Sequence, residues 1–175
     1  SSGEHLGNLL TTTGESTRVR LTFSSASQFA AGSEAGGLVE PRVDLLGELA
    51  VAEATADFLY TAVTGTVVAS RGSLTFEGLD PQASLGLRLF ASRSGGDREI
   101  VVYRVSGSGQ PRSQTLAASG EEPAAGLAFE GNRQTVVEFD SLRADASGRL
   151  HIDFEPESGA LGSTASLALI ELGIR

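Results

Sequence analysis

The fold of this chain is decided by residues 73–107, which read SLTFEGLDPQASLGLRLFASRSGGDREIVVYRVSG. Apolar residues recur at every second position in three parts of this stretch, at 74–76, 85–89 and 101–105. A two-residue period is what a half-buried strand needs, because successive side chains point to opposite faces of a sheet. The turn-forming residues Gly78–Pro81 separate the first two runs. We therefore expect three strands here, each with one face on a core and the other in water.

The same alternation continues outward, at 19–23, 135–139 and 150–154. Short strands at this spacing, in a chain of 175 residues with 22 glycines, predict an all-β fold. We expect an antiparallel β-sandwich of about eight to ten strands. Residues 74–90 and 137–154 both follow the order strand, short connector, turn, strand. This likeness predicts two hairpins at similar places in a two-sheet sandwich.

Three parts of the chain depart from the strand pattern. Alanine, leucine and glutamate cluster at 43–56, the one helical candidate in the sequence. Residues 111–131 are rich in Ala, Gly, Glu and Pro, which predicts a long surface loop, and residues 1–16 are expected to form an irregular N-terminal segment. The length suits a single domain over residues 1–175.

Composition limits the functions that the chain can have. Cysteine is absent, so disulfides, thiolate metal sites and a thiol nucleophile are excluded. The net charge of −9 argues against nucleic acid and anionic membrane surfaces as partners, because their phosphates would be repelled. No apolar run approaches the roughly 20 residues of a membrane-spanning helix, so no membrane insertion is expected. An acidic chain whose basic residues are all arginine is typical of a GC-rich or salt-adapted genome.

Four short motifs in the first stretch occur in a familiar order: Gly-Leu-Asp-Pro at 78–81, Phe-x-Ser-Arg at 90–93, Asp-Arg at 97–98 and Tyr-x-Val at 103–105. With them, residues 74–104 resemble the galactose-binding-like jelly-roll domains, similar to carbohydrate-binding modules, of secreted bacterial proteins. The segments NRQTVVEFDSLRADASGRLHIDFEP and ASLALIELGIR are similar to the final hairpin and last strand of that group. The resemblance implies a jelly-roll sandwich that accompanies carbohydrate-active enzymes or cell-surface proteins, and a secreted or cell-surface location.

The N-terminal region differs from that group. The group opens with a strand that reads like Ile-x-Val-Asp-Phe-Gly, and nothing before Asn8 matches it. The N-terminus also lacks the basic-then-apolar order of a signal peptide, so we expect a chain whose signal has been removed or a domain excised from a longer protein. An edge without its opening strand invites strand addition by another protein. The leading hypothesis is a non-catalytic, extracellular accessory module with carbohydrate as the first candidate ligand. The alternative is a structural or protein-interaction domain of a surface assembly.

Catalysis ranks third among these hypotheses. His5 lies near the N-terminus, and His151 falls on the polar face of a predicted strand. No Gly-x-Ser-x-Gly elbow precedes a helix, although a Ser-His-Asp triad of an esterase-type hydrolase depends on spatial proximity. The carboxylates of Asp153, Glu155 and Glu157 share one outward strand face, which is ordinary for a solvated sheet. We therefore expect no catalytic residues and no enzyme activity.

The ligand-binding candidates are Arg93, Asp97, Arg98 and Tyr60. An arginine fork can bind the planar oxygens of a carboxylate or the oxygens of a sugar, and a tyrosine ring can stack on a sugar face. The alternative is structural, with Asp97 bonded to a neighbouring arginine to close the loop. The absence of tryptophan weakens a polysaccharide-stacking role.

A structural calcium ion is the one cofactor that the sequence suggests. Sandwich domains can hold calcium with carboxylates and backbone carbonyls gathered from separate loops. The candidate ligands are Asp97 and Glu99 in one glycine-rich loop, and Asp140 and Asp145 near another turn. Residues 145–148 lack the alternating oxygen ligands of an EF-hand loop and suit a hairpin turn instead.

Overall fold

The computed structural model describes residues 5–7, 9–23, 28–30, 36–62, 71–95, 97–121, 123–157 and 163–174. Nearly all of its regular structure is strand. In chain order the elements are β1 (His5–Leu6), β2 (Arg20–Phe23), β3 (Gln28–Ala30), α1 (Val43–Leu46), the 3₁₀ turn η2 (Gly47–Leu49), α2 (Ala52–Ala56), β4 (Phe58–Ala62), β5 (Gly72–Glu77), β6 (Leu85–Phe90), β7 (Ile100–Ser106), β8 (Arg112–Ala117), β9 (Val137–Leu142), β10 (Leu150–Pro156), β11 (Thr164–Leu167) and β12 (Leu169–Ile174).

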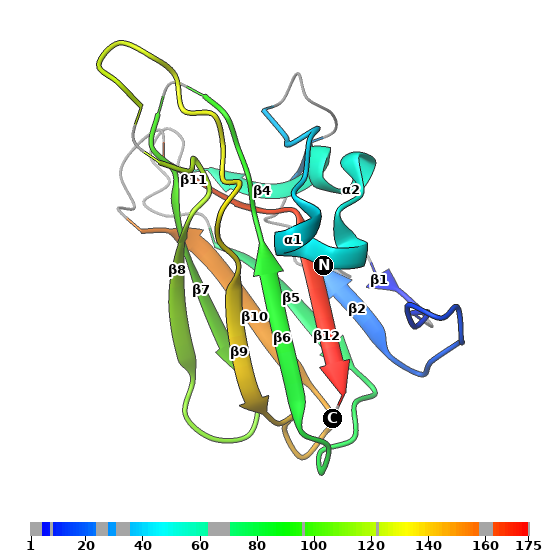
Figure 1. Ribbon diagram of the computed structural model, residues 1–175. Coiled ribbons are helices and arrows are strands. Elements are labelled where there is room, and N and C mark those ends of the chain that lie inside the picture. The colour runs from blue at the N-terminus through cyan, green and yellow to red at the C-terminus, as the bar shows by residue number, and fades with distance from the viewer. Residues whose placement is uncertain are drawn as a thin grey trace.

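The strands form two packed layers (Figure 1). One layer is a six-stranded sheet in the order β1-β2-β5-β10-β7-β8, and the other consists of two three-stranded sheets, β11-β4-β3 and β12-β6-β9. All neighbouring strands run antiparallel. The last segment of the chain passes from one small sheet to the other at Ala168, whose N–H donates to the Phe90 carbonyl at 2.9 Å. The prediction of an all-β, antiparallel, jelly-roll-like sandwich is confirmed.

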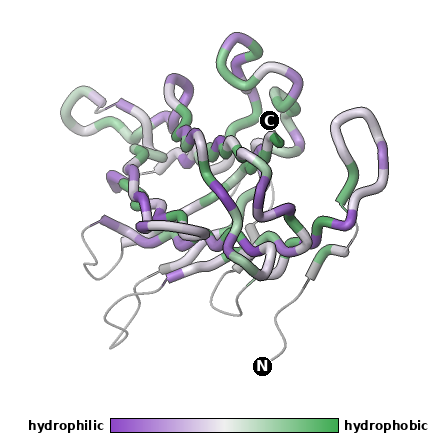
Figure 2. The backbone as a smooth tube through the Cα atoms, turned by 90° about the horizontal axis from the view of Figure 1, so that it is seen from below, coloured by the Kyte–Doolittle hydropathy of each residue, from purple (hydrophilic) through white to green (hydrophobic). Residues whose placement is uncertain are grey.

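The core lies between the layers and follows the predicted alternation. Hydrophilic and hydrophobic residues alternate along much of the tube in Figure 2. Leu74, Tyr103, Ile152 and Phe154 from the six-stranded sheet have no exposed surface, and Leu87 of the facing sheet is 1% exposed. Burying side chains of this size contributes about 1.5–3 kcal/mol each. The six strands expected from the sequence pattern are all present, within three residues of the predicted bounds.

The two predicted hairpins are wrong, because β5 and β6 belong to different layers, and so do β9 and β10. Each pair is an arch that crosses from one sheet to the other. The likeness between the two segments has a physical reason, since the arches lie at the same end of the sandwich and touch. The Leu79 N–H donates to the Gly148 carbonyl at 3.1 Å.

The helical candidate at 43–56 forms three short helical pieces that pack on the outer face of β6 and its neighbours. Leu38, Leu46 and Phe90 form a second, small core there. Arg88 fixes this segment to the sheet: its guanidinium bonds Glu171 at 2.7 Å and Glu138 at 3.1 Å, and it donates to the Leu45 carbonyl at 2.8 Å. One arginine therefore joins three strands to α1.

The predicted surface loop at 111–131 is partly wrong, because β8 occupies its first third. The polar side chains of β8 explain why its sequence does not read as a strand. Arg112 and Gln114 donate to the carbonyls of Asp140 and Glu138, which lie on the edge strand β9. These bonds satisfy backbone groups that would otherwise be open to another chain.

At the opposite edge of the six-stranded sheet, β1 pairs with β2 through His5↔Thr22 and Leu6↔Leu21. The edge that the sequence leaves open is therefore covered over two residues by a short first strand. Within the described residues, no helix is long and apolar enough to cross a membrane.

The contact between the arches can be tested with two glycine substitutions. Gly148→Ala is expected to cost about 2–4 kcal/mol, because alanine is strained at positive φ and its Cβ would lie 2.5 Å from the Leu79 carbonyl oxygen. Gly109→Ala is the control: its φ of 98° is also positive, but nothing lies within 4 Å of the added atom, so about 1 kcal/mol is expected. Urea unfolding measures both, and equal losses would contradict the described packing of the arches.

Candidate functional site

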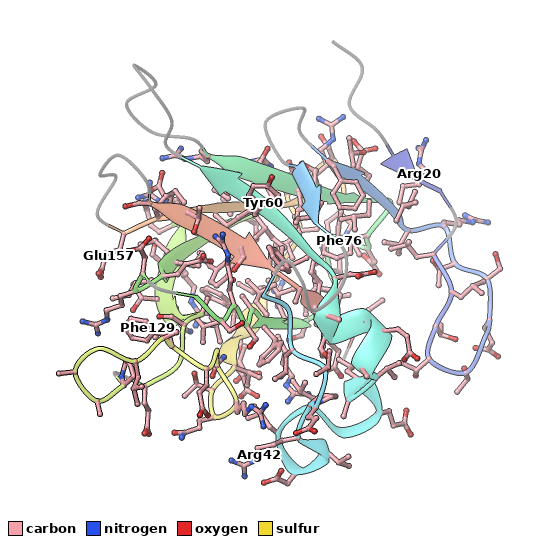
Figure 3. The ribbon with its side chains drawn as sticks, turned by 90° about the horizontal axis from the view of Figure 1, so that it is seen from above. Arg20, Arg42, Tyr60, Phe76, Phe129 and Glu157 are labelled. Atoms are coloured by element: carbon pink, nitrogen blue, oxygen red, sulfur yellow. The ribbon has the colours of Figure 1, made fainter. Side chains whose placement is uncertain are left out.

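The loops at the upper end of the sandwich in Figure 1 form the candidate site. The described residues of three segments meet there: 91–95 with 97–99, 118–121 with 123–135, and 163–166. The Ala118 carbonyl joins the first two, because it accepts from the N–H of Arg93 at 2.8 Å and from that of Asn132 at 2.9 Å. Figure 3 looks down on this end, with Tyr60, Phe129 and Glu157 labelled around it.

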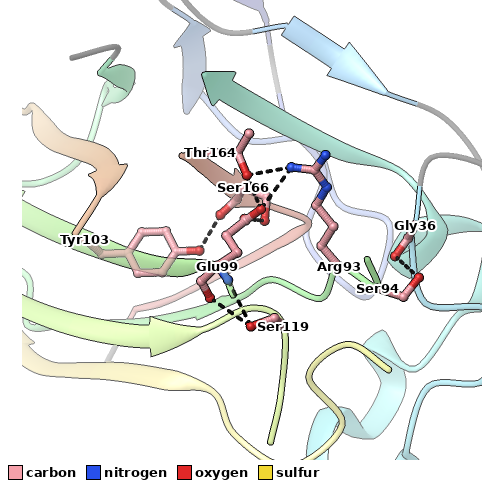
Figure 4. Close-up of polar contacts among 8 residues, drawn as sticks. All are labelled: Gly36, Arg93, Ser94, Glu99, Tyr103, Ser119, Thr164 and Ser166. Atoms are coloured by element: carbon pink, nitrogen blue, oxygen red, sulfur yellow. Dashed lines mark hydrogen bonds and ion pairs between the residues drawn. The ribbon is translucent and has the colours of Figure 1, made fainter. Parts of the chain in front are cut away.

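A buried carboxylate organises this end (Figure 4). Glu99 is 5% exposed, and both of its oxygens accept hydrogen bonds. Oε2 accepts from the Arg93 guanidinium at 3.0 Å and from the Thr164 hydroxyl, while Oε1 accepts from the Ser166 hydroxyl. A buried charge is tolerated only when it is paired and hydrogen-bonded in this way.

Tyr103 and Ser119 extend the cluster. The Tyr103 hydroxyl donates to the Ser166 carbonyl at 2.6 Å, and the Ser119 hydroxyl accepts from the Glu99 backbone N–H at 3.0 Å. Tyr103 has no exposed surface. Burial, and next the nearby carboxylate of Glu99, raise the pKa of Tyr103 well above its usual value. The cluster thus joins the start of β7 to β11 in the facing layer.

The ligand-binding candidates Arg93 and Tyr60 are brought together by Phe58. The guanidinium carbon of Arg93 lies 6.0 Å from the centre of the Phe58 ring, and that ring meets Tyr60 edge-on with centroids 6.1 Å apart. Arg93 also pairs with Glu99, so the carboxylate that closes this loop is Glu99 rather than Asp97. The structure gives Arg93 a structural role, and whether it or Tyr60 touches a ligand stays a prediction.

Asp97 and Arg98 are both exposed. Among the described residues, no ion pair joins Asp97 to Arg93 or Arg98. Arg98 lines a small cavity of about 160 Å³ together with Ile100, Pro156, Glu157, Ser163 and Thr164. Ligand pockets usually measure about 300–1,000 Å³, so this cavity is too small to hold more than part of a sugar chain.

The predicted calcium ligands do not gather into one site, and two of them, Glu99 and Asp145, have other contacts. Both oxygens of Glu99 are occupied as described, and Asp145 Oδ1 accepts from the backbone N–H groups of Ser147 and Arg149 in its own turn. Asp140 lies on β9. In the part of the chain that the structure describes, no three His, Asp or Glu side chains gather where they could hold a metal ion. Calcium binding remains a prediction.

His151 lies on the outer face of the six-stranded sheet. Its Nδ1 is 2.9 Å from the Thr75 hydroxyl, and its Nε2 is 3.1 Å from Asp153 Oδ1. Arg71 adds ion pairs to Asp153 at 3.8 Å and to Glu155 at 2.7 Å. The arrangement has the order hydroxyl, imidazole, carboxylate, but these three side chains stand on a strand face, as the alternation predicts for solvated residues.

A groove of about 440 Å³ runs along the loop between β8 and β9, and it is the feature that sequence reasoning missed. Its size falls within the usual range for ligand sites. Its lining combines hydrogen-bonding side chains with apolar ones. Its lining residues are Ala117, Gly120, Glu121, Pro123, Ala124, Leu127, Ala128, Glu130, Gly131, Asn132, Arg133, Gln134 and Thr135.

Asn132 holds the backbone of the loop that forms this groove. It is 1% exposed, and its amide nitrogen donates to the carbonyls of Ala91 at 3.0 Å and Thr135 at 2.7 Å. Its side-chain oxygen accepts from the backbone N–H groups of Gln134 and Thr135, each at 3.0 Å. An asparagine that bonds the backbone just after itself is a known turn signal, and the sequence Asn-Arg-Gln-Thr contains it.

Comparison with known proteins identifies the fold and no family. No protein-family model and no curated protein matches the sequence. The carbohydrate-binding module TmCBM61, in complex with β-1,4-galactotriose, is 14% identical with a TM-score of 0.49, over 93% of this chain and 92% of that one. The enzymatically active domain of tailspike protein 4 of bacteriophage CBA120 is 10% identical with a TM-score of 0.50, over 89% of this chain and 19% of that one.

An exo-β-1,3-galactanase from Phanerochaete chrysosporium, solved with galactose, is 16% identical with a TM-score of 0.39, over 92% of this chain and 31% of that one. The chain therefore spans less than a third of the tailspike and galactanase chains. At these identities the likeness describes the fold alone. The chain has a jelly-roll-like β-sandwich fold, as its sequence resemblance implies.

The Glu99 cluster is expected to matter more for stability than any exposed ion pair. Glu99→Gln leaves the Arg93 charge without its partner and should cost about 2–4 kcal/mol, since breaking a buried pair is costly even when one partner is partly exposed. Glu155→Gln, which breaks the more exposed pair with Arg71, should cost less than about 1 kcal/mol. Chemical unfolding compares the two, and similar small losses would contradict the role of the cluster.

The raised pKa of Tyr103 predicts that the protein loses stability at alkaline pH. Because its pKa is raised in the folded state, the folded protein resists its ionisation. The stabilisation is complete below the unfolded pKa of about 10 and is lost above it, at up to about 1.4 kcal/mol per pH unit. Unfolding free energies measured from pH 8 to 11.5 should therefore fall more steeply for the wild type than for Tyr103→Phe. Equal slopes would contradict the prediction.

Proposed function

We propose that this chain is a non-catalytic, extracellular module that binds carbohydrate in the groove between β8 and β9. The observation that carries the proposal is the chemistry of the groove. Glu121, Glu130 and Gln134 offer acceptors and donors at its polar side, and Pro123 and Leu127 offer apolar surface. Leu127 is 67% exposed, so its side chain is accessible to a ligand.

Sugars match this mixture of groups. Each hydroxyl can both donate and accept a hydrogen bond, and the C–H face of the ring is apolar. A binding site for a small polar ligand therefore needs a few placed polar groups beside apolar surface. None of the described residues that line the groove carries an aromatic ring, so stacking contributes nothing there. We expect affinities in the micromolar to millimolar range.

A rigid floor supports the proposal. Asn132 ties the groove to the strand-end segment at Ala91, and the Ala118 carbonyl ties both to the loop of Arg93. Polar groups held in place before binding lose less conformational entropy when a ligand arrives. The resemblance of the sequence to domains of secreted proteins supports the extracellular location. The fold by itself is compatible with many functions.

The proposal is tested by glycan binding with groove variants. The protein should bind at least one neutral oligosaccharide on a glycan array, and the variant Glu130→Ala/Gln134→Ala should weaken that binding about tenfold or more, because two hydrogen-bonding groups are removed. Glu48→Ala, an exposed carboxylate on η2 outside the groove, should leave affinity unchanged. Parallel arrays with calcium and with a chelator also test the calcium prediction. No binding on any array would contradict the proposed function.

A further inference from the structure

Arg133 is held less tightly than the well-paired arginines of this fold. Arg71, Arg88 and Arg93 each make an ion pair at 3.0 Å or less. Arg133 lines the groove and makes one ion pair, from Nη1 to Glu40 at 3.6 Å. The side chain of Glu40 is 78% exposed, so this pair is worth little in water. Arg133 is therefore weakly anchored in the free protein.

One donor of Arg133 has no partner among the described residues. Its Nε is buried, and no hydrogen bond to it is found among the described residues. A buried donor without a partner costs about 1–3 kcal/mol. A rotation of the Arg133 side chain that lets Nε donate to a ligand in the groove would recover this free energy. The free protein thus holds a donor group whose hydrogen bond is not yet made.

We propose that Arg133 recognises the ligand by hydrogen bonding, a role that rests on the proposed function of the groove. On binding, the guanidinium leaves Glu40 and donates through Nε and one terminal nitrogen to two neighbouring hydroxyl oxygens of a neutral sugar. Side-on donation to two oxygens is the geometry that the arginine fork favours.

The charges around the groove select hydroxyls over a carboxylate as the acceptors. Glu121 and Glu130 line the same groove, and both are exposed. A uronate or sulfate would meet these two negative charges, in a chain whose net charge is already −9. A hydroxyl has no charge, and after it accepts from Arg133 it can still donate its own proton to a carboxylate. The ligand class is therefore a neutral glycan with hydroxyls on adjacent ring carbons.

Calorimetric titration with a panel of neutral trisaccharides tests this proposal; the panel holds β-1,4-galactotriose, cellotriose, xylotriose and mannotriose. Arg133→Gln and Arg133→Lys should each weaken the binding seen with the wild type by about tenfold or more, because neither side chain can donate side-on to two oxygens. Glu40→Gln should bind as tightly as the wild type or up to a few-fold more tightly, because it removes the carboxylate that competes for Arg133. The uronic acid form of the best trisaccharide should bind more weakly.

A second measurement reports on Arg133 directly. The Nε–Hε NMR signal of Arg133, assigned by its loss in Arg133→Lys, should shift and exchange more slowly with water when the trisaccharide is added. Four results would each overturn the role of Arg133 and leave carbohydrate binding intact. They are wild-type affinity in Arg133→Gln, weaker binding in Glu40→Gln, tighter binding of the uronate, and an unchanged Nε–Hε signal in the complex. If no trisaccharide binds the wild type, the proposed function itself fails, and the proposal for Arg133 fails with it.

Discussion

The burial of one carboxylate, Glu99, is the constraint on which the upper end of this sandwich depends. A charged group that is 5% exposed must find donors, and those donors come from separate parts of the chain. Arg93 comes from the segment after β6, while Thr164 and Ser166 come from β11. These bonds fix the end of one layer against the other, where backbone pairing between the layers is not possible.

The two ends of the sandwich are closed by different means. At the lower end the arches touch through backbone atoms, as the bond from Leu79 to Gly148 shows, and a glycine is needed there because a side chain would not fit. At the upper end polar side chains join the loops, with Glu99 and Asn132 as the buried members. Buried polar groups satisfied in this way make a loop region rigid. The groove is formed on this rigid end, and several of the residues that line it are exposed.

The sequence pattern predicts the strands well because alternation reports which residues face the core. It does not report which strand lies beside which, so β5 to β6 and β9 to β10 were expected as hairpins and are arches. The sequence pattern does not predict β8, because its polar Arg112 and Gln114 bond the edge of β9 in place of apolar contacts. The pattern also brings Arg93 and Glu99 to attention, as ligand and metal candidates, but it cannot reveal that they pair with each other. Most of the groove residues carry no strand pattern, and the composition of 111–131 predicts a surface loop without indicating a groove.

Whether a neutral sugar binds in the groove formed by the loop between β8 and β9 can be seen in a crystal structure of the complex with a neutral trisaccharide. We expect the sugar to lie against Leu127 and Gln134, with the Arg133 guanidinium turned away from Glu40 and toward two adjacent hydroxyls. A sugar bound on the outer face of the six-stranded sheet beside His151, or in the small cavity beside Arg98 with the groove unoccupied, would contradict it.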